Sequence, residues 1–166
     1  MQTDCSVIVR APYRAKRAEI DDFLAEKNDW IEKNLLKMRK RLDALDDTEK
    51  LTRSEVRKLA EEALAYIPPR VLYYARIMGV RYGIVTIRNQ KTRWGSCSTK
   101  GNLNFNCLLM LLPEEVRDYV IVHELCHLIE PNHSRAFWDQ VGRYCPDYKA
   151  MKKYLSEKGD ALMMRL

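Results

Sequence analysis

Apolar and charged positions alternate at helical spacing over most of the chain, and a short section in the middle has the pattern of β-strands. Near the N-terminus, the β-branched residues of Ser6–Arg10 predict a short strand, which Pro12 ends because proline interrupts a strand ladder. From Lys16 to about Leu45, apolar residues recur near helical spacing between charged ones, which predicts one long helix. The polar segment 46–50 then predicts a break.

A second helix is predicted to begin at Thr52. Thr52 and Glu55 form a capping-box pattern, in which each side chain satisfies a free backbone N–H of the other residue. Pro68 and Pro69 follow inside the pattern, and we expect them to interrupt or bend the helix because proline removes a helical hydrogen bond. The pattern then resumes and ends at Gly79.

Strand-like sequence follows the second helix. Residues 83–89 and 102–106 alternate or cluster as strands do, and the Gly-containing segment 93–98 lies between them, so we expect a small antiparallel unit. Asn102, Asn104 and Asn106 lie at alternate positions, and a solvated strand face is the expected interpretation.

The next helix is predicted to be buried. Pro113 suits a first helical turn, where its missing N–H costs nothing, and the pattern runs to about Leu128. From Val116 to Ile129 the positions are apolar nearly all round, which is typical of a central core helix.

The C-terminal section predicts two more helices, over residues 134–144 and 146–158, with a short tail from Gly159. The whole pattern predicts an α+β fold in which a small antiparallel sheet packs on a buried helix and the rest is mostly helical.

The buried helix carries His123-Glu124-Leu125-Cys126-His127, an H-E-x-x-H pattern. His127 lies about 40° around the helix from His123 and one turn along it, so both imidazoles can converge on one point. Glu124 flanks that point and can hold a water there without being a ligand. His133 follows, and all three histidines of the chain fall within residues 123–133. Three imidazoles and one open position are typical of a catalytic zinc site.

Two other residues could contribute to such a site. Cys126 lies inside the motif, but it points away from His127 on the far side of His123, so packing is the favoured role. Glu130 competes as the third ligand, because carboxylates also complete zinc sites. His133 is favoured, since a ligand from the returning chain closes the site more easily.

The donor set predicts a zinc-dependent hydrolase. Zinc lowers the pKa of a bound water to about 7, and Glu124 can take the proton of that water as general base and return it to the leaving group. Peptide hydrolysis is the default reaction for this arrangement. Arg135 and Tyr144 are candidates for a further oxyanion stabiliser.

The segment Arg93-Trp94-Gly95-Ser96 has two equally weighted interpretations. It can be a substrate-binding loop and strand edge that faces the metal, with Arg93 meeting substrate charge. It can equally be a tight turn whose Trp94 packs on the core. Phe137 and Trp138 are interpreted as the core of the helix over the metal rather than as a binding platform.

Several of these segments, in this order and spacing, resemble the YgjP-like metallopeptidase family. They are residues 92–98 (TRWGSCS), 101–106 (GNLNFN), 119–128 (YVIVHELCHL), 131–134 (PNHS), 137–138 (FW) and 146–148 (PDY). The resemblance implies a zincin-like fold of minigluzincin type, related to SprT-like zincins. It also implies zinc held by His123, His127 and His133, with Glu124 as base. Residues 51–166 would be the metallopeptidase domain, and residues 1–50 a shortened accessory part.

The positive charge of the chain is concentrated in one part of the sequence. The formal net charge is +6, from 29 Lys and Arg against 23 Asp and Glu. No acidic residue occurs from position 63 to 113, and this segment holds seven basic residues. It contains the predicted strands beside the metal helix, so the charge favours an anionic or acidic substrate.

Other features concern the cellular setting. Five widely spaced cysteines without a C-x-x-C pair argue against a disulfide framework, and no apolar run has signal-peptide or membrane-spanning length. We therefore expect a cytoplasmic protein with no membrane partner.

Two alternatives to a peptide or protein substrate stay open. One is a metal-dependent phosphohydrolase acting on a nucleotide or another anionic small molecule, which the basic segment favours. The other is a nucleic-acid-associated binding module, which is possible but which no recognisable nucleic-acid-binding motif supports.

Overall fold

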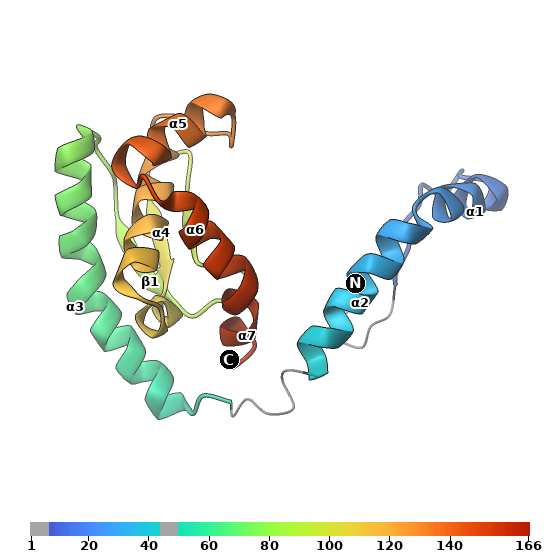
Figure 1. Ribbon diagram of the computed structural model, residues 1–166, viewed down its shortest axis with the longest axis horizontal. Coiled ribbons are helices and arrows are strands. Elements are labelled where there is room, and N and C mark those ends of the chain that lie inside the picture. The colour runs from blue at the N-terminus through green and yellow to red at the C-terminus, as the bar shows by residue number, and fades with distance from the viewer. Residues whose placement is uncertain (1–6, 44–49) are drawn as a thin grey trace. The chain divides into compact units, whose positions relative to one another are not determined.

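The computed structural model describes residues 7–43 and 50–166. The contacts divide the chain into two compact units, Met1–Thr48 and Glu49–Leu166 (Figure 1). Each unit is described by itself below.

The N-terminal unit contains two helices, α1 (Arg17–Glu26) and α2 (Asn28–Asp43), with Lys27 between them. The prediction of one continuous helix from Lys16 is therefore wrong: the Lys27 backbone (φ −96°, ψ 6°) leaves the helical conformation and closes α1. The predicted strand at Ser6–Arg10 is also not found over residues 7–10, because no described segment pairs with that backbone. The predicted helix end at Leu45 and most of the polar break lie outside the described residues.

Helix α3 (Arg53–Met78) opens the second unit as predicted. Thr52 Oγ1 accepts a hydrogen bond from the Glu55 N–H at 3.2 Å, and the Thr52 N–H donates to Glu55 Oε2 at 2.8 Å. The helix ends at Gly79, whose φ of 68° is the left-handed conformation that glycine adopts freely.

The predicted interruption at Pro68 and Pro69 is wrong, because α3 runs through both residues. The buried side chains of Ile67 and Val71 pack into the core on either side of the prolines and hold the helix in place. The carbonyl groups that lose their partners belong to the preceding turn, 64–65, where the residues are exposed to water.

The sheet contains β1 (Val85–Arg88), β2 (Gly95–Cys97) and β3 (Leu103–Asn106) in the order β1-β3-β2. The predicted strands β1 and β3 are parallel, whereas β2 pairs antiparallel with β3. The expectation of a wholly antiparallel unit is therefore wrong. The segment between the two predicted strands forms a strand of its own, and its hairpin with β3 reverses the chain before β3 begins.

Helix α4 (Glu114–Cys126) follows the short helix η1 (Cys107–Leu111) and is buried as predicted, although it ends two residues earlier. Figure 1 shows α4 between α3 and α6 (Tyr148–Tyr154), both of which contact it. The core of this unit consists of the inner faces of α3 and α4, the side chains of β3 and η1, and Phe137 and Val141 of α5 (Arg135–Tyr144).

The C-terminal end is helical beyond the predicted tail. A π-helical turn η2 (Leu155–Gly159) and α7 (Asp160–Met163) continue α6. Gly159 is buried, and a β-carbon built on it would lie 3.0 Å from Trp94 Nε1. The tail prediction is wrong because Trp94 packs on this backbone, so the glycine is a packing position and not a helix end.

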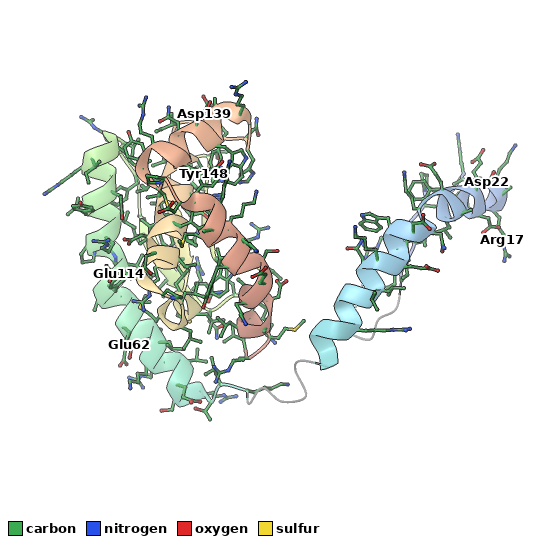
Figure 2. The ribbon with its side chains drawn as sticks, in the orientation of Figure 1. Arg17, Asp22, Glu62, Glu114, Asp139 and Tyr148 are labelled. Atoms are coloured by element: carbon green, nitrogen blue, oxygen red, sulfur yellow. The ribbon has the colours of Figure 1, made fainter. Side chains whose placement is uncertain are left out.

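A half-buried ion pair joins α3 to α4. Arg70 Nε donates to Asp118 Oδ1 at 2.9 Å, a second guanidinium N–H reaches Asp118 Oδ2, and the Tyr74 hydroxyl donates to the same oxygen at 2.8 Å. Glu114, labelled in Figure 2, lies 3.6 Å from the same guanidinium. These contacts fix the helix that presents the histidines.

Candidate metal centre

Two histidines lie at the C-terminal end of α4. His123 is in its last turn, and His127 is the C-cap residue, so their rings lie one helical turn apart with centroids separated by 5.0 Å. The remaining α4 side chains pack in the core, because the helix is apolar nearly all round. A buried helix therefore holds both rings at the edge of the core.

The third histidine comes from the loop after α4. Ser134 caps α5 through a hydrogen bond from the Phe137 N–H at 3.2 Å, which fixes the chain next to His133. His133 Nε2 lies 3.0 Å from His123 Nε2, and one ring nitrogen from each of the three histidines lies within 4.8 Å of the others.

These nitrogens fit a common metal ion. Two nitrogens bonded to one tetrahedral zinc ion are about 3.4 Å apart, which falls inside the observed range. Neutral imidazoles are also the form that binds metal. Burial lowers the pKa of His123 to about 3, helped by His127, His133 and Lys152, and burial likewise lowers the pKa of His127. The chemistry and the spacing of the donor set therefore suit a metal.

Glu124 lies beside the histidines with only 6% of its surface exposed. Burial raises the pKa of this carboxyl group to about 8, and the charge of Arg93 opposes the rise. A carboxyl group with a pKa near neutrality can both accept and return a proton at physiological pH.

Strand β2 passes directly over Glu124. A β-carbon built on Gly95 would lie 2.7 Å from Glu124 Oε1 and 2.8 Å from Glu124 Cγ, closer than real side-chain contacts. Only a residue without a side chain lets the carboxyl group and the strand approach this closely.

A cavity of about 580 Å³ opens over the histidines and Glu124. Its walls come from β2 and the turn that follows it, from α4, and from the loop after α4. The lining residues are Gly95, Ser96, Cys97, Ser98, Thr99, Gly101, His123, Glu124, His127, Leu128, Pro131 and His133. Among the residues that the structure describes, β2 pairs with β3 alone, so its other edge is available to the cavity.

Aromatic rings of α5 and α6 pack around the histidines. The fully buried ring of Phe137 contacts all three imidazoles, with centroid distances of 4.6–4.9 Å. The half-buried Trp138 stacks on His133 (5.7 Å, 26°) and on Tyr148 (5.3 Å, 16°), which is labelled in Figure 2. Phe137 is core, as expected, whereas Trp138 supports a candidate ligand directly.

The other predicted site residues lie outside the cavity lining. Arg93 is exposed next to Trp94, and its charge reaches Glu124. Trp94 is half-buried against Gly159, as in the packing interpretation. Arg135 is exposed at the first turn of α5, and Tyr144 packs on the core at its end.

Neither of the two competing candidate ligands, Glu130 and Cys126, belongs to the histidine cluster. The three histidines form the cluster of potential ligands among the described residues, and Glu130 is not part of it. Cys126 is fully buried in the core, and burial raises the pKa of its thiol to about 12, which favours a neutral packing side chain.

The expected solvated asparagine face is wrong. Asn106 is buried, and its amide donates to the Gln90 and Arg93 carbonyls at 2.6 and 2.9 Å. Asn102 accepts from the Ile84 N–H at 3.0 Å, and Asn104 donates to Ser96 Oγ at 3.3 Å. These amides satisfy backbone and side-chain groups of the short sheet, a use that alternation alone does not reveal.

Sequence reasoning missed several residues of the cavity. The turn residues after β2 were not among the predicted site residues, although they follow Gly95 and Ser96 directly in the chain, and Leu128 lies next to His127. Lys152 was also missed, because α6 is distant in sequence and only the fold brings it near the histidines.

A buried helix with two histidines and a carboxyl group, a third histidine from the next loop and an open cavity define the class of metal-dependent hydrolases. The model of the YgjP-like metallopeptidase domain matches residues 1–59 and 41–158. The chain therefore belongs to the YgjP-like metallopeptidase family, and it is a hydrolase.

Solved structures of metallopeptidases are similar to this chain. The metallopeptidase zymogen abylysin of Pyrococcus abyssi is 26% identical, with a TM-score of 0.50 over 55% of this chain and 93% of that chain. The metallopeptidase zymogen jannalysin of Methanocaldococcus jannaschii shares the fold, with 22% identity, a TM-score of 0.50, and coverage of 55% and 95%. A comparison with curated proteins found no match.

Among the described residues, the helices are too short or too polar to span a membrane.

Proposed function

We propose that this chain is a zinc-dependent metallopeptidase with a zincin-like catalytic domain of minigluzincin type over residues 51–166. His123, His127 and His133 hold the zinc, and Glu124 is the general base. The observation that carries the proposal is one cavity in which three imidazole nitrogens within 4.8 Å of one another lie beside a buried carboxyl group. Family membership supports a peptide or protein substrate.

The chemistry follows from the positions of the side chains. A bound zinc ion polarises a carbonyl oxygen and makes water a better nucleophile near neutral pH. Glu124 takes a proton from the attacking water and passes it to the leaving nitrogen. Its raised pKa suits both transfers, and Gly95 keeps β2 from displacing it.

An extended peptide would bind along the free edge of β2. The residues of β2 line the cavity, and their outer backbone groups can pair with a substrate strand, as in other cases of strand addition. This arrangement favours a role for Gly95 and Ser96 in substrate binding. Residues 1–50 would be an accessory part, and the free cysteines favour a cytoplasmic setting.

The proposal is tested with purified protein, stripped of metal and reloaded with zinc. We expect casein or mixed peptides to be cleaved by the zinc-loaded wild type, with activity lost in a chelator and in Glu124→Gln. Zinc-loaded, folded protein that cleaves no peptide of a broad library would contradict the proposal.

A phosphohydrolase is the second candidate. The acid-free segment 63–113 includes β2, and the cavity lining has no acidic residue besides Glu124, both of which favour an anionic substrate. Release of phosphate from nucleotides by the zinc-loaded protein, lost in Glu124→Gln and faster than peptide cleavage, would favour it over the peptidase.

A further inference from the structure

Two cationic side chains flank the histidine cluster without a carboxylate partner. They are Arg93, two residues before β2, and Lys152, on α6. No ion pair joins either of them to a carboxylate of the described residues. Arg70, from the same acid-free segment as Arg93, is by contrast paired with Asp118.

Arg93 lies two residues before Gly95, the residue whose backbone approaches Glu124 closely. Its carbonyl accepts from the Asn106 side chain at 2.9 Å, and the Trp94 carbonyl accepts from the Asn106 N–H at 2.8 Å, so β3 fixes the backbone just before Gly95. The side chain is exposed, and its charge reaches the Glu124 carboxyl group. The backbone at Arg93 is therefore fixed at one end of the edge strand, and its side chain is exposed to the solvent.

Lys152 is held on the other side by the aromatic stack. Its ammonium lies 4.1 Å from the centroid of the Trp138 ring, in cation–π contact, and Trp138 stacks on His133. The ammonium is thus one aromatic ring away from a candidate zinc ligand. The neighbouring Lys153 differs, because it pairs with Glu157 at 3.8 Å on the same helix.

The cavity lining carries no acidic residue that would repel an anion, apart from the candidate base Glu124. An extended peptide rises about 3.3 Å per residue, so side chains within two or three residues of the cleaved bond extend about 7–10 Å from it, toward the elements that carry the two cations. Unpaired cations beside a partly enclosed cavity attract carboxylates more strongly than the same charges spread over a surface.

We propose that the enzyme prefers acidic peptides, in which Glu or Asp side chains close to the cleaved bond bind Arg93 and Lys152. This proposal rests on the peptidase function above and adds its substrate class. Arg93 and Lys152 are specificity residues and take no part in the chemical step. A charge pair at such an exposed position changes kcat/KM by about a few-fold, and the effect weakens as salt is added.

The test uses quenched-fluorescence peptides that share one sequence and carry Glu, Gln or Lys at each of the three positions on either side of the cleaved bond. Mass spectrometry of the products locates that bond. We expect the wild type to cleave the Glu peptides with a kcat/KM at least roughly fivefold above the Gln peptides, and the Lys peptides more slowly still. The preference should shrink when the salt concentration of the assay is raised from about 50 to about 500 mM, because salt screens exposed charges.

Charge-removing variants assign the preference to the two cations. Arg93→Gln and Lys152→Gln should each lower the Glu/Gln preference by roughly threefold to fivefold. The preference is a ratio measured on the same variant, so a change in the basal rate of that variant cancels. The matched controls Arg88→Gln and Lys153→Gln remove the same charge. Arg88 reaches Asn104, whose partner in β2 is Ser96 and not Gly95, the residue that meets Glu124. Lys153 pairs with Glu157. Both controls should keep the preference.

Each other outcome counts against the inference. Peptides cleaved with zinc but without preference for Glu overturn it and leave the peptidase function standing. Equal losses in the controls show a net-charge effect and also overturn it. No zinc-dependent cleavage of any peptide overturns the peptidase function and this inference together.

Discussion

Replacing Gly95 with alanine tests the proposed placement of the catalytic base. The new β-carbon would lie 2.7 Å from Glu124 Oε1, 2.8 Å from Cγ and 2.9 Å from Cδ. Ordinary contacts between such atoms are about 3.4 Å or longer, so the carboxyl group or the strand must move by more than about 0.5 Å. The clash involves the whole end of the side chain, because three of its atoms are too close.

The expected loss follows from this displacement. A misplacement of about 1 Å in a reacting group can cost about 100-fold in rate, so we expect kcat/KM to fall roughly 10- to 100-fold. The zinc affinity should stay close to that of the wild type, since the three atoms nearest to the new β-carbon all belong to Glu124 and not to a histidine. Overpacking of this kind costs about 1–3 kcal/mol in the free energy of unfolding, so the variant must also be checked for folding.

The assay is zinc-dependent peptide cleavage, together with zinc titration and urea unfolding of the same samples. Gly142→Ala is the matched control, because its nearest non-local atom, Tyr148 Cε1, is at an ordinary 3.5 Å. In a Glu124→Asp background, Gly95→Ala should cost much less, since the shorter side chain withdraws from the strand. Full activity in Gly95→Ala, or the same loss in both backgrounds, would refute the placement.

Four further predictions concern metal binding and stability. Trp138→Leu should raise the zinc Kd roughly tenfold in a chelator competition, because it removes the ring that stacks on a ligand, whereas Trp30→Leu should leave it unchanged. Asp118→Asn should lower the free energy of unfolding by about 2 kcal/mol in urea titrations, as its side chain is only 14% exposed and bonds two partners. Pro69→Ala should raise it by about 1–2 kcal/mol, because the helix regains a hydrogen bond; an unchanged urea midpoint would count against a continuous helix. With metal removed, stability should fall between pH 6.5 and 8, because below pH 6.5 the lowered pKa of His123 gives a slope of opposite sign. The folded pKa of Glu124, about 8, exceeds its ordinary 4.5, so the folded chain keeps a proton that the unfolded chain has lost. The slope is at most about 1.4 kcal/mol per pH unit, and Glu124→Gln should abolish it.

The helices of the second unit could be predicted well because their signals are local. The Thr52 and Glu55 side chains mark a helix start, Gly79 marks an end, and the apolar run 116–129 marks a buried helix, which ends at Cys126. Continuity through Pro68 and Pro69 could not be predicted, since it depends on core packing on both sides of the prolines. The parallel pairing of β1 with β3 could not be predicted either, because it depends on β2, whose three residues carry no recognisable strand pattern.

Part of the candidate site could likewise be predicted from the sequence, and part of it could not. The H-E-x-x-H spacing is enough to place His123, Glu124 and His127 on one side of a helix, and Pro131 indicates the return of His133. The pattern could not reveal the contact between Gly95 and Glu124 or the stack of Trp138 on His133. Those contacts join elements that are distant in the sequence, so only the fold defines them.

Activity measured against bound zinc tests the central claim most directly. Metal-free protein is titrated with zinc, and peptide cleavage is recorded together with the zinc bound per chain. The account predicts that cleavage rises linearly and stops at one zinc per chain. It also predicts that Glu124→Gln binds the same zinc without cleaving and that His133→Ala binds it more weakly. Cleavage by the metal-free protein, or full cleavage by zinc-loaded Glu124→Gln, would contradict it.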